Sequence, residues 1–210
     1  QLIEDVWRYI KFYRNIQFGN IEQLIEFERN SVNDTQLSYQ IEPETSVTYL
    51  PTLEAHRCFL RHSLLTAKRR IIICSPFISS GSYEDFSPEI LRATANRGVD
   101  IYFVCLTEQS QENEFDLFID EINSPLVHLC HSDDIHLKTL IVDDDIIAEG
   151  SFNWISATRD EGAQAHNLET TLIVRGGIAR GFIDNFEHSA LGRYISQWEN
   201  SDHEEGGASD

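Results

Sequence analysis

The pattern of apolar and polar residues predicts helices and strands that alternate along the chain. Apolar residues recur at the three- and four-residue spacing of amphipathic helices over 1–29, 52–68, 87–97, 112–122, 178–188 and 189–198. Apolar or alternating runs between them predict strands at RRIIICSPFIS, VDIYFVCL, PLVHLC, HLKTLIVD, IIAEG and NLETTLIV. The alternation, closed by three consecutive strands, predicts an α/β fold with a mixed β-sheet flanked by helices.

The same pattern divides the chain near residue 50. Residues 1–50 hold two helical stretches, a polar loop and a candidate strand, SVTYL, and we expect a helical appendage or the end of a preceding domain. The remaining elements fall in 51–198, and the acidic segment 199–210 is typical of a disordered tail. The chain begins with Gln1 and contains no Met, so we expect a processed chain or a domain of a longer protein.

Composition and charge narrow the class of protein. Hydrophobic residues make up 41% and charged residues 24%, as in soluble globular domains, and no run approaches the roughly 20 apolar residues of a membrane span. The N-terminus lacks a targeting signal, so we expect a cytoplasmic protein without membrane contact. The net charge of −19 opposes a basic nucleic-acid-binding face. It leaves open a local basic patch near Lys138 and at Lys68, Arg69, Arg70, Arg92 and Arg97.

The four cysteines carry no metal-binding or disulfide signal. None of them forms a C-x-x-C pair, and Cys74, Cys105 and Cys130 lie in apolar runs. We therefore expect buried core thiols and no zinc site.

One segment carries candidate chemistry. Residues 136–153 read HLKTLIVDDDIIAEGSFN, which places His136, Lys138 and Asp143 at H-x-K-x4-D spacing, followed by Gly-Ser-x-Asn. Downstream, Asn167 and Glu169 form an N-x-E sequence. The segment resembles the HKD motif of the phospholipase D superfamily at each of these positions. The resemblance implies a phospholipase D-like fold, with 51–198 as the catalytic domain.

The spacing of His136 and Lys138 suits phosphoryl chemistry. Residues i and i+2 of a strand point to the same face, so we expect the two side chains to share one pocket. An imidazole can attack phosphorus and split a hard displacement into two easier steps. A neighbouring lysine neutralises phosphate oxygens and favours the neutral, nucleophilic ring.

The other motif residues complete a predicted phosphate clamp. We expect Gly150-Ser151 to start a turn where backbone and hydroxyl approach the substrate, and Asn153 to donate its amide to a phosphate oxygen. Lys138, Ser151 and Asn153 are the predicted phosphate-binding residues. Glu169, on a neighbouring strand, is predicted to orient the His136 ring. The resemblance implies that Asp143 supports the motif rather than touching substrate.

Several of these residues also have a purely structural interpretation. Ser151 by itself can be a helix N-cap, and Trp154 is interpreted as a core residue. Four histidines do not fit the spacing of the motif and are interpreted as structural or surface residues: His56, His62, His131 and His166. The chemical rival is a metal site built from Asp133, Asp134, His136 and Asp143–Asp145. The resemblance implies metal-independent catalysis, so we expect no metal and no cofactor.

The superfamily mechanism uses two histidines, and no second H-x-K-x4-D occurs in this sequence. The small bacterial endonucleases of the superfamily meet as dimers, so the resemblance implies a homodimer that shares one composite active site. The alternatives are a second motif outside this sequence, or a degenerate copy, against which the intact motif argues.

These observations favour a DNA endonuclease that acts through a phosphohistidine, within a larger restriction or phage-defence protein. The net charge indicates that another domain or subunit delivers the nucleic acid. The alternatives are a lipid or small-molecule phosphodiesterase and a non-catalytic dimerisation module.

Overall fold

In a computed structural model of the chain, the described residues are 37–42, 45–107, 112–133, 135–156 and 169–195. The helices expected over 1–29 and the acidic tail at 199–210 lie outside these ranges.

The fold is built on one eight-stranded sheet with the order β1-β2-β8-β7-β6-β3-β4-β5. β3 pairs parallel to β4, and β4 parallel to β5, whereas every other pair is antiparallel. The mixed sheet predicted from the sequence is therefore confirmed. The strands are β1 (Leu37–Glu42), β2 (Thr45–Leu50), β3 (Arg70–Cys74), β4 (Asp100–Leu106), β5 (Val127–Ser132), β6 (Thr139–Val142), β7 (Ile146–Gly150) and β8 (Thr171–Arg175).

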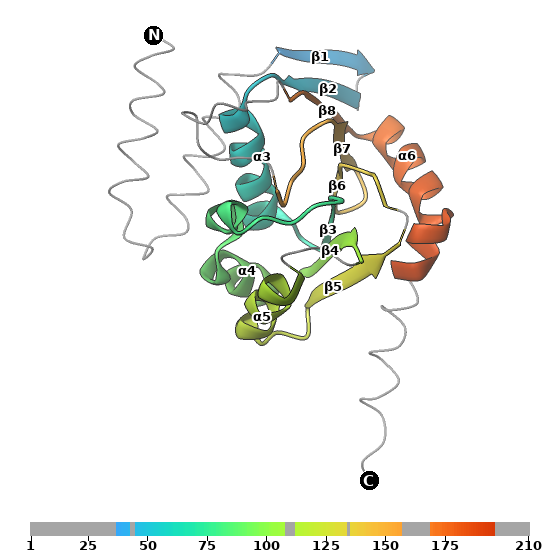
Figure 1. Cartoon of the computed structure of the whole chain (residues 1–210). Helices are drawn as coiled ribbons and strands as arrows, with labels where there is room; N and C mark the ends of the chain where they lie inside the picture. The colour runs from blue at the N-terminus through green and yellow to red at the C-terminus, as the bar shows by residue number, and fades with distance from the viewer. Residues whose placement is uncertain (1–36, 43–44, 108–111, 134, 157–168, 196–210) are drawn as a thin grey trace, which may run out of the picture.

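Helices cover both faces of this sheet. α3, α4 and α5 lie on one face, and α6 lies on the other (Figure 1). Residues 190–195 are also helical, and the 3-10 helix η1 between β3 and α4 was not predicted. The bounds are α3 (Leu53–Thr66), η1 (Ser80–Phe86), α4 (Pro88–Ala95), α5 (Glu112–Ile122) and α6 (Gly177–Glu187).

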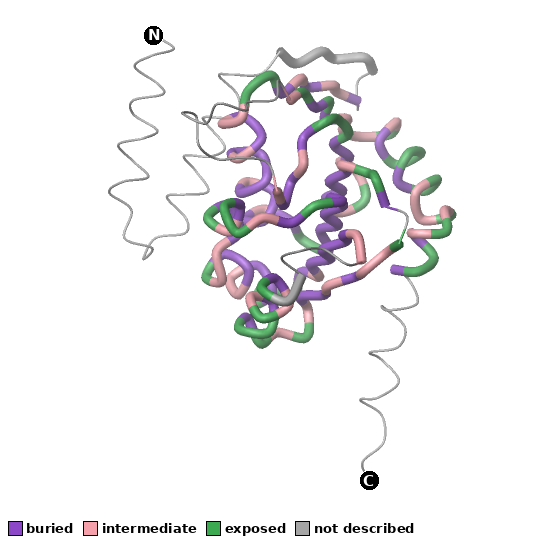
Figure 2. The backbone as a smooth tube through the Cα atoms, viewed as in Figure 1, coloured by how far each residue is buried: buried purple, intermediate pink, exposed green. Residues whose placement is uncertain are grey.

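Alternation along the strands divides the core in two. Ile71 and Ile73 of β3 face the cluster under α3, α4 and α5, whereas Ile72 and Cys74 face the smaller cluster under α6. The buried positions follow the central strands and the inner sides of the helices (Figure 2). All four cysteines are free and buried, as the sequence predicted.

The boundary that we drew after residue 50 cuts through this sheet. The candidate strand SVTYL is confirmed as part of β2, which pairs along its length with β8. β1 pairs with β2 in turn, so residues 37–50 contribute two strands to the sheet and not an appendage. α3 begins directly afterwards, where the Thr52 hydroxyl accepts a hydrogen bond from Ala55 N at 3.2 Å.

Two strands are shorter than predicted. The run HLKTLIVD was expected to be strand throughout, yet β6 begins only at Thr139. The carbonyl of Lys138 accepts a hydrogen bond from the indole of Trp154 at 3.1 Å rather than a backbone N–H of β7. β8 likewise begins at Thr171, after the Asn-x-Glu sequence.

Candidate active site

His136 and Lys138 lie immediately before β6, at one edge of the sheet. β6 runs antiparallel to β3, and Ile73 near the end of β3 pairs with Leu140 near the start of β6. The motif pair therefore lies at the same edge as the carboxyl ends of β3, β4 and β5. Such edges gather polar side chains from successive loops in α/β proteins.

The side chains of His136 and Lys138 meet, as predicted, although they do not belong to a strand. Lys138 Nζ lies 3.4 Å from His136 Nε2 and 3.4 Å from the His136 carbonyl oxygen. His136 is exposed and Lys138 is partly buried. The contact places the ammonium beside the ring nitrogen, so both groups can face one ligand.

A fully buried aromatic residue stands behind the pair. Trp154 has 0% of its surface exposed, which confirms its predicted place in the core. Its ring packs edge-on against Phe152 at 5.1 Å between centroids and tilted against Phe59 at 6.2 Å. Its indole N–H reaches the Lys138 carbonyl, so the core is tied directly to the motif.

Gly150 ends β7 and, with Ser151, lies beside the start of β8. A Cβ on Gly150 would lie 2.1 Å from the Thr170 carbonyl oxygen, so only glycine permits this close approach. We had expected the close approach to be toward a substrate, but it is between two strands. Ser151 is exposed, its N–H donates to the Thr170 oxygen at 2.9 Å, and its hydroxyl accepts from Thr170 N at 3.1 Å. The hydroxyl proton remains available to a ligand.

Asn153 is partly buried in the short segment between Ser151 and Trp154. Its Oδ1 is buried and has no hydrogen-bond donor within the described residues. A buried amide oxygen without a partner is costly and uncommon in folded proteins. Within the described part of the chain, the hydrogen bonding of the Asn153 amide oxygen is therefore incomplete.

Glu169 lies just before β8. That strand is separated from β6 by β7, and the described part of the chain contains no hydrogen bond between Glu169 and His136. The predicted neighbouring strand is thus one strand further away. Asn167, the first residue of the N-x-E sequence, lies outside the described residues.

Asp143 lies at the opposite end of β6 from Lys138, about 16 Å away at the rise of a strand. Its carboxylate accepts backbone N–H groups from Lys68 at 3.0 Å, Arg69 at 2.8 Å and Arg70 at 3.3 Å. Its backbone adopts φ 52°, a left-handed conformation that Asp tolerates better than most residues. Asp143 therefore cannot join a catalytic set around His136, and it joins the β6–β7 turn to the start of β3.

The positions of these residues along β6 argue against the alternative metal site. Asp143, Asp144 and Asp145 lie at the far end of β6 from His136, so they cannot surround one ion with it. Among the residues that the structure describes, no group of three or more His, Cys, Asp or Glu side chains is arranged to hold a metal.

Glu149 is an ionisable neighbour of the site that the sequence reading missed. It pairs in register with Thr139, whose hydroxyl donates to its carboxylate. Desolvation raises the Glu149 pKa, and the Thr139 hydrogen bond opposes that shift. Burial, and next the Glu149 charge, raise the pKa of the Cys74 thiol. The only sequence signal for Glu149 is its place just before the Gly-Ser pair.

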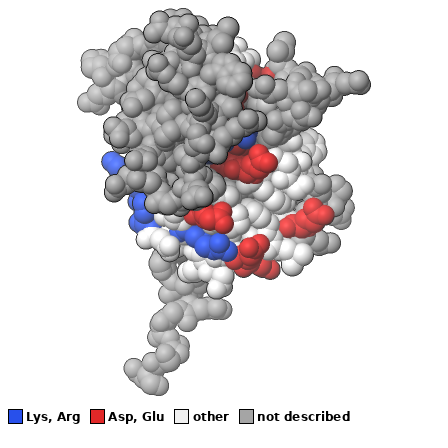
Figure 3. Space-filling view, turned by 90° about the vertical axis from the view of Figure 1, so that its left-hand side faces the viewer, with Lys and Arg blue, Asp and Glu red and all other residues white. Residues whose placement is uncertain are grey.

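Part of the predicted basic patch is paired with acidic side chains. Arg69 pairs with Asp144 at 2.6 Å, Arg70 pairs with Asp144 at 3.2 Å and also with Glu187. In the face shown in Figure 3, acidic side chains lie beside the basic ones and interrupt any continuous basic surface.

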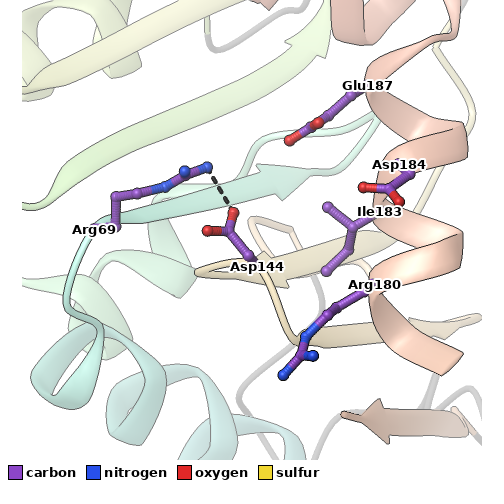
Figure 4. A pocket seen from close by; sticks show the side chains of 6 residues that line it. All are labelled: Arg69, Asp144, Arg180, Ile183, Asp184 and Glu187. Carbon is purple, nitrogen blue, oxygen red and sulfur yellow. Dashed lines mark ion pairs between the residues drawn. The ribbon is translucent and has the colours of Figure 1, made fainter. Parts of the chain in front are cut away.

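Some of these residues line a pocket of about 310 Å³ between the β6–β7 turn and α6 (Figure 4). Arg69 and Asp144 approach it from the sheet, and Arg180, Ile183, Asp184 and Glu187 approach it from α6. The pocket lies at the Asp143 end of β6, away from His136.

Comparison with known proteins decides the family. A family model described as "Cardiolipin synthase, PLD-like domain" matches residues 60–189, which is more than half of the chain. The chain belongs to the phospholipase D-like family. The match runs from the second half of α3 to the end of α6 and includes the whole HKD motif. Membership supports the phosphodiester chemistry of the superfamily, while the family description leaves the substrate class open.

Solved structures agree with this phospholipase D-like fold. NucT from Helicobacter pylori is 17% identical, with a TM-score of 0.54 over 71% of this chain and 97% of that chain. The phospholipase D family member Nuc from Salmonella typhimurium is 22% identical, with a TM-score of 0.50 over 69% and 93%. Phosphatidylserine synthase from Haemophilus influenzae Rd KW20 is 12% identical, with a TM-score of 0.51 over 83% and 43%. At these identities the likeness concerns the fold alone.

A search of curated proteins finds no match to this phospholipase D-like chain. No helix within the described residues is long and apolar enough to cross a bilayer.

Proposed function

We propose that the chain is a metal-independent phosphodiesterase, and specifically a DNA endonuclease that acts through a phosphohistidine at His136. The observation that carries the proposal is the contact between Lys138 Nζ and His136 Nε2 at 3.4 Å, with the ring itself exposed. An imidazole open to solvent and flanked by an ammonium suits in-line attack on a phosphodiester.

In the first step, a ring nitrogen of His136 attacks phosphorus, so a P–N bond forms and the P–O bond to the leaving oxygen breaks. A second histidine supplies the proton that the leaving oxygen takes up. In the second step, water attacks phosphorus, the P–N bond breaks, and the second histidine accepts the proton of the water. Lys138 neutralises the phosphate oxygens in both steps, and no metal ion takes part.

The hydroxyl of Ser151 and the amide of Asn153 are the proposed partners of the non-bridging oxygens. Ser151 is exposed with its proton available, and the hydrogen bonding of Asn153 is incomplete. Glu169 takes the proposed role of orienting the ring of His136.

The second histidine is proposed to come from a second copy of the chain, because this sequence holds one motif. A two-fold dimer then shares one composite site. Mixing wild-type protein with an excess of His136→Ala chains tests this arrangement. Activity that falls faster than the wild-type fraction is expected, because a mixed dimer lacks one of the two histidines. A strictly proportional decrease contradicts a shared site.

The proposed DNA substrate has to overcome a net charge of −19. We therefore expect a further domain or subunit to deliver the DNA, as in a restriction or phage-defence protein. Titration of labelled DNA with the isolated chain at low salt tests this expectation. Tight binding by this chain alone removes the need for a delivering domain.

The direct test is cleavage of single- and double-stranded DNA in EDTA by the wild type, His136→Ala and His188→Ala. His188 is an exposed histidine on the C-terminal side of α6, so its variant controls for purification and general loss of histidine. Cleavage that survives EDTA and His188→Ala but disappears in His136→Ala is expected. Cleavage by all three proteins indicates a contaminating nuclease and contradicts the assignment.

Exposed apolar side chains near the site favour one second candidate, a lipid phosphodiesterase. Leu137 between the two motif residues is 41% exposed, Phe77 after β3 is 45% exposed, and Leu172 at the start of β8 is 48% exposed. Hydrolysis of phospholipid vesicles without cleavage of DNA replaces the nuclease by this candidate. Absence of both activities in the wild type leaves the non-catalytic module.

A further inference from the structure

Lys138 needs an anchor that the sheet does not supply. The ladder between β6 and β7 ends with the pair Thr139 and Glu149, so the backbone of Lys138 lies outside it. A flexible lysine on an unpaired segment samples many positions, and misplacement of a charged group by about 1 Å can cost a site up to 100-fold in rate.

The indole of Trp154 is the group that holds this backbone. Its Nε1 donates to the Lys138 carbonyl at 3.1 Å, and the side chain is completely buried. Indole has a single donor and no acceptor, so its one polar atom is committed to the lysine.

Trp154 is itself fixed from two elements. His56 of α3 lies 5.8 Å from it and stacks on Phe152 at 4.2 Å between centroids. The two ring nitrogens of His56 bond the Thr52 carbonyl at 2.6 Å and the Thr171 hydroxyl at 2.8 Å. The start of α3, the start of β8 and the indole are therefore one packed unit.

We propose that Trp154 is a positioning residue that, through the Lys138 carbonyl, sets where the Lys138 ammonium lies relative to His136 and a bound phosphate. The proposal rests on the proposed function, because it assigns Trp154 to the phosphate site of that reaction. It concerns the buried N–H, not the bulk of the ring.

Trp154→Phe removes the N–H and keeps an aromatic ring in the core. Phe59→Leu is the matched control, because Phe59 packs on the same indole from α3 but has no bond to the motif. Inorganic phosphate binding by calorimetry and DNA cleavage in EDTA are measured for both variants, for Lys138→Ala and for Trp154→Phe combined with Lys138→Ala.

Trp154→Phe is expected to weaken phosphate binding and lower kcat/KM by about three- to tenfold each, whereas Phe59→Leu lowers only the melting temperature. In the Lys138→Ala background, Trp154→Phe is expected to have no further effect, because its role passes through the lysine. The same loss in both backgrounds indicates a general structural role and overturns the proposal, as does wild-type behaviour of Trp154→Phe.

If Trp154→Phe fails to fold, NMR of the wild-type protein still tests the proposal. In the wild type, the indole N–H resonance of Trp154 is expected to be protected from exchange and to shift when inorganic phosphate is added. An indole signal that ignores phosphate, in a protein that binds phosphate and cleaves DNA, overturns the positioning role alone. A wild type that neither binds phosphate nor cleaves DNA overturns the proposed function, and the positioning role with it.

Discussion

The two ends of β6 are built in opposite ways. At the histidine end, before Thr139, the side chains of His136 and Lys138 touch mainly each other, at 3.4 Å. At the aspartate end, after Val142, the Asp143 carboxylate accepts three backbone N–H groups, and neighbouring arginines pair with Asp144. Among the described residues, the polar side chains at the histidine end remain able to bind a ligand, whereas the Asp143 carboxylate at the aspartate end is already hydrogen-bonded to the backbone.

The two ends of β6 therefore meet two different requirements, ligand binding at the histidine end and support of the fold at the aspartate end, although both belong to one sequence motif. Residues that bind a ligand must leave donors and charge unsatisfied in the free protein, which costs stability. Residues that hold the frame must satisfy theirs. Substitutions at the histidine end should therefore change activity with little change in stability, and substitutions at the aspartate end should do the reverse.

The largest effect is expected from Lys138→Met. The variant keeps an unbranched side chain but removes the charge that faces the phosphate, so kcat/KM should fall roughly 100- to 1000-fold. The free energy of unfolding should change by less than about 0.5 kcal/mol, since the site is open. Kinetics and urea unfolding check both expectations, with the exposed Lys68→Met as control. A loss of several kcal/mol would mean that the histidine end also carries the fold.

Gly150→Ala should cause the largest loss of stability. The added Cβ meets the Thr170 oxygen at 2.1 Å and the Thr171 hydroxyl at 2.6 Å, so β7 and β8 must separate. We expect a loss of about 3 kcal/mol or more in urea unfolding, or failure to fold. Gly181→Ala on α6, where a Cβ meets nothing within 4 Å, is the matched control. Equal stability of the two variants would contradict the close approach.

Asp143→Ala tests the aspartate end. Three backbone N–H groups lose their acceptor, and alanine is less tolerant of φ 52°, so we expect a loss of about 2–3 kcal/mol. Asp144→Ala should cost under about 1 kcal/mol, because Asp144 is 53% exposed. Activity per folded molecule, measured well below the midpoint of unfolding, should stay near that of the wild type. An inactive but stable Asp143→Ala would place the aspartate in the chemistry after all.

The smallest effect is a pH dependence at Glu149. Desolvation raises its pKa in the folded state, so this residue favours folding while protonated and disfavours it once ionised. Stability should therefore fall slightly as the pH rises above the ordinary value of 4.5, and Glu149→Gln should remove that slope. Because part of the Glu149 side chain remains exposed to solvent, which screens its charge, the difference should stay below about 1 kcal/mol. Thermal melts from pH 4 to 8 check it, and a wild type that gains stability over Glu149→Gln on ionisation contradicts the sign.

The strands and helices followed from local pattern, because apolar periodicity reports burial directly. α5 has its predicted bounds, and α3, α4 and α6 agree within two residues. The motif spacing predicted the meeting of His136 and Lys138 for the wrong reason, since a strand was assumed where the backbone is unpaired. Local sequence contains no sign that the Trp154 indole replaces a strand partner.

Contacts between segments that lie far apart in the sequence could not be predicted from local patterns. The pairing of Asp143 with the N–H groups of residues 68–70 joins segments more than 70 residues apart. Sheet order places β7 between β8, which follows Glu169, and β6, which follows His136, and no spacing in the sequence encodes that order. The inclusion of β1 and β2 in the sheet depends in the same way on β8.

That last pairing has a consequence for synthesis of the protein. β2 at residues 45–50 pairs with β8 at residues 171–175, so an early strand finds its neighbour only near the end of the chain. On the ribosome, β2 and the Gly150-Ser151 edge of β7 must both wait until β8 emerges, because β8 lies between them. Non-local closure of this kind slows folding. A nascent chain that has completed its HKD motif therefore still lacks β8, the strand that joins β2 to the rest of the sheet.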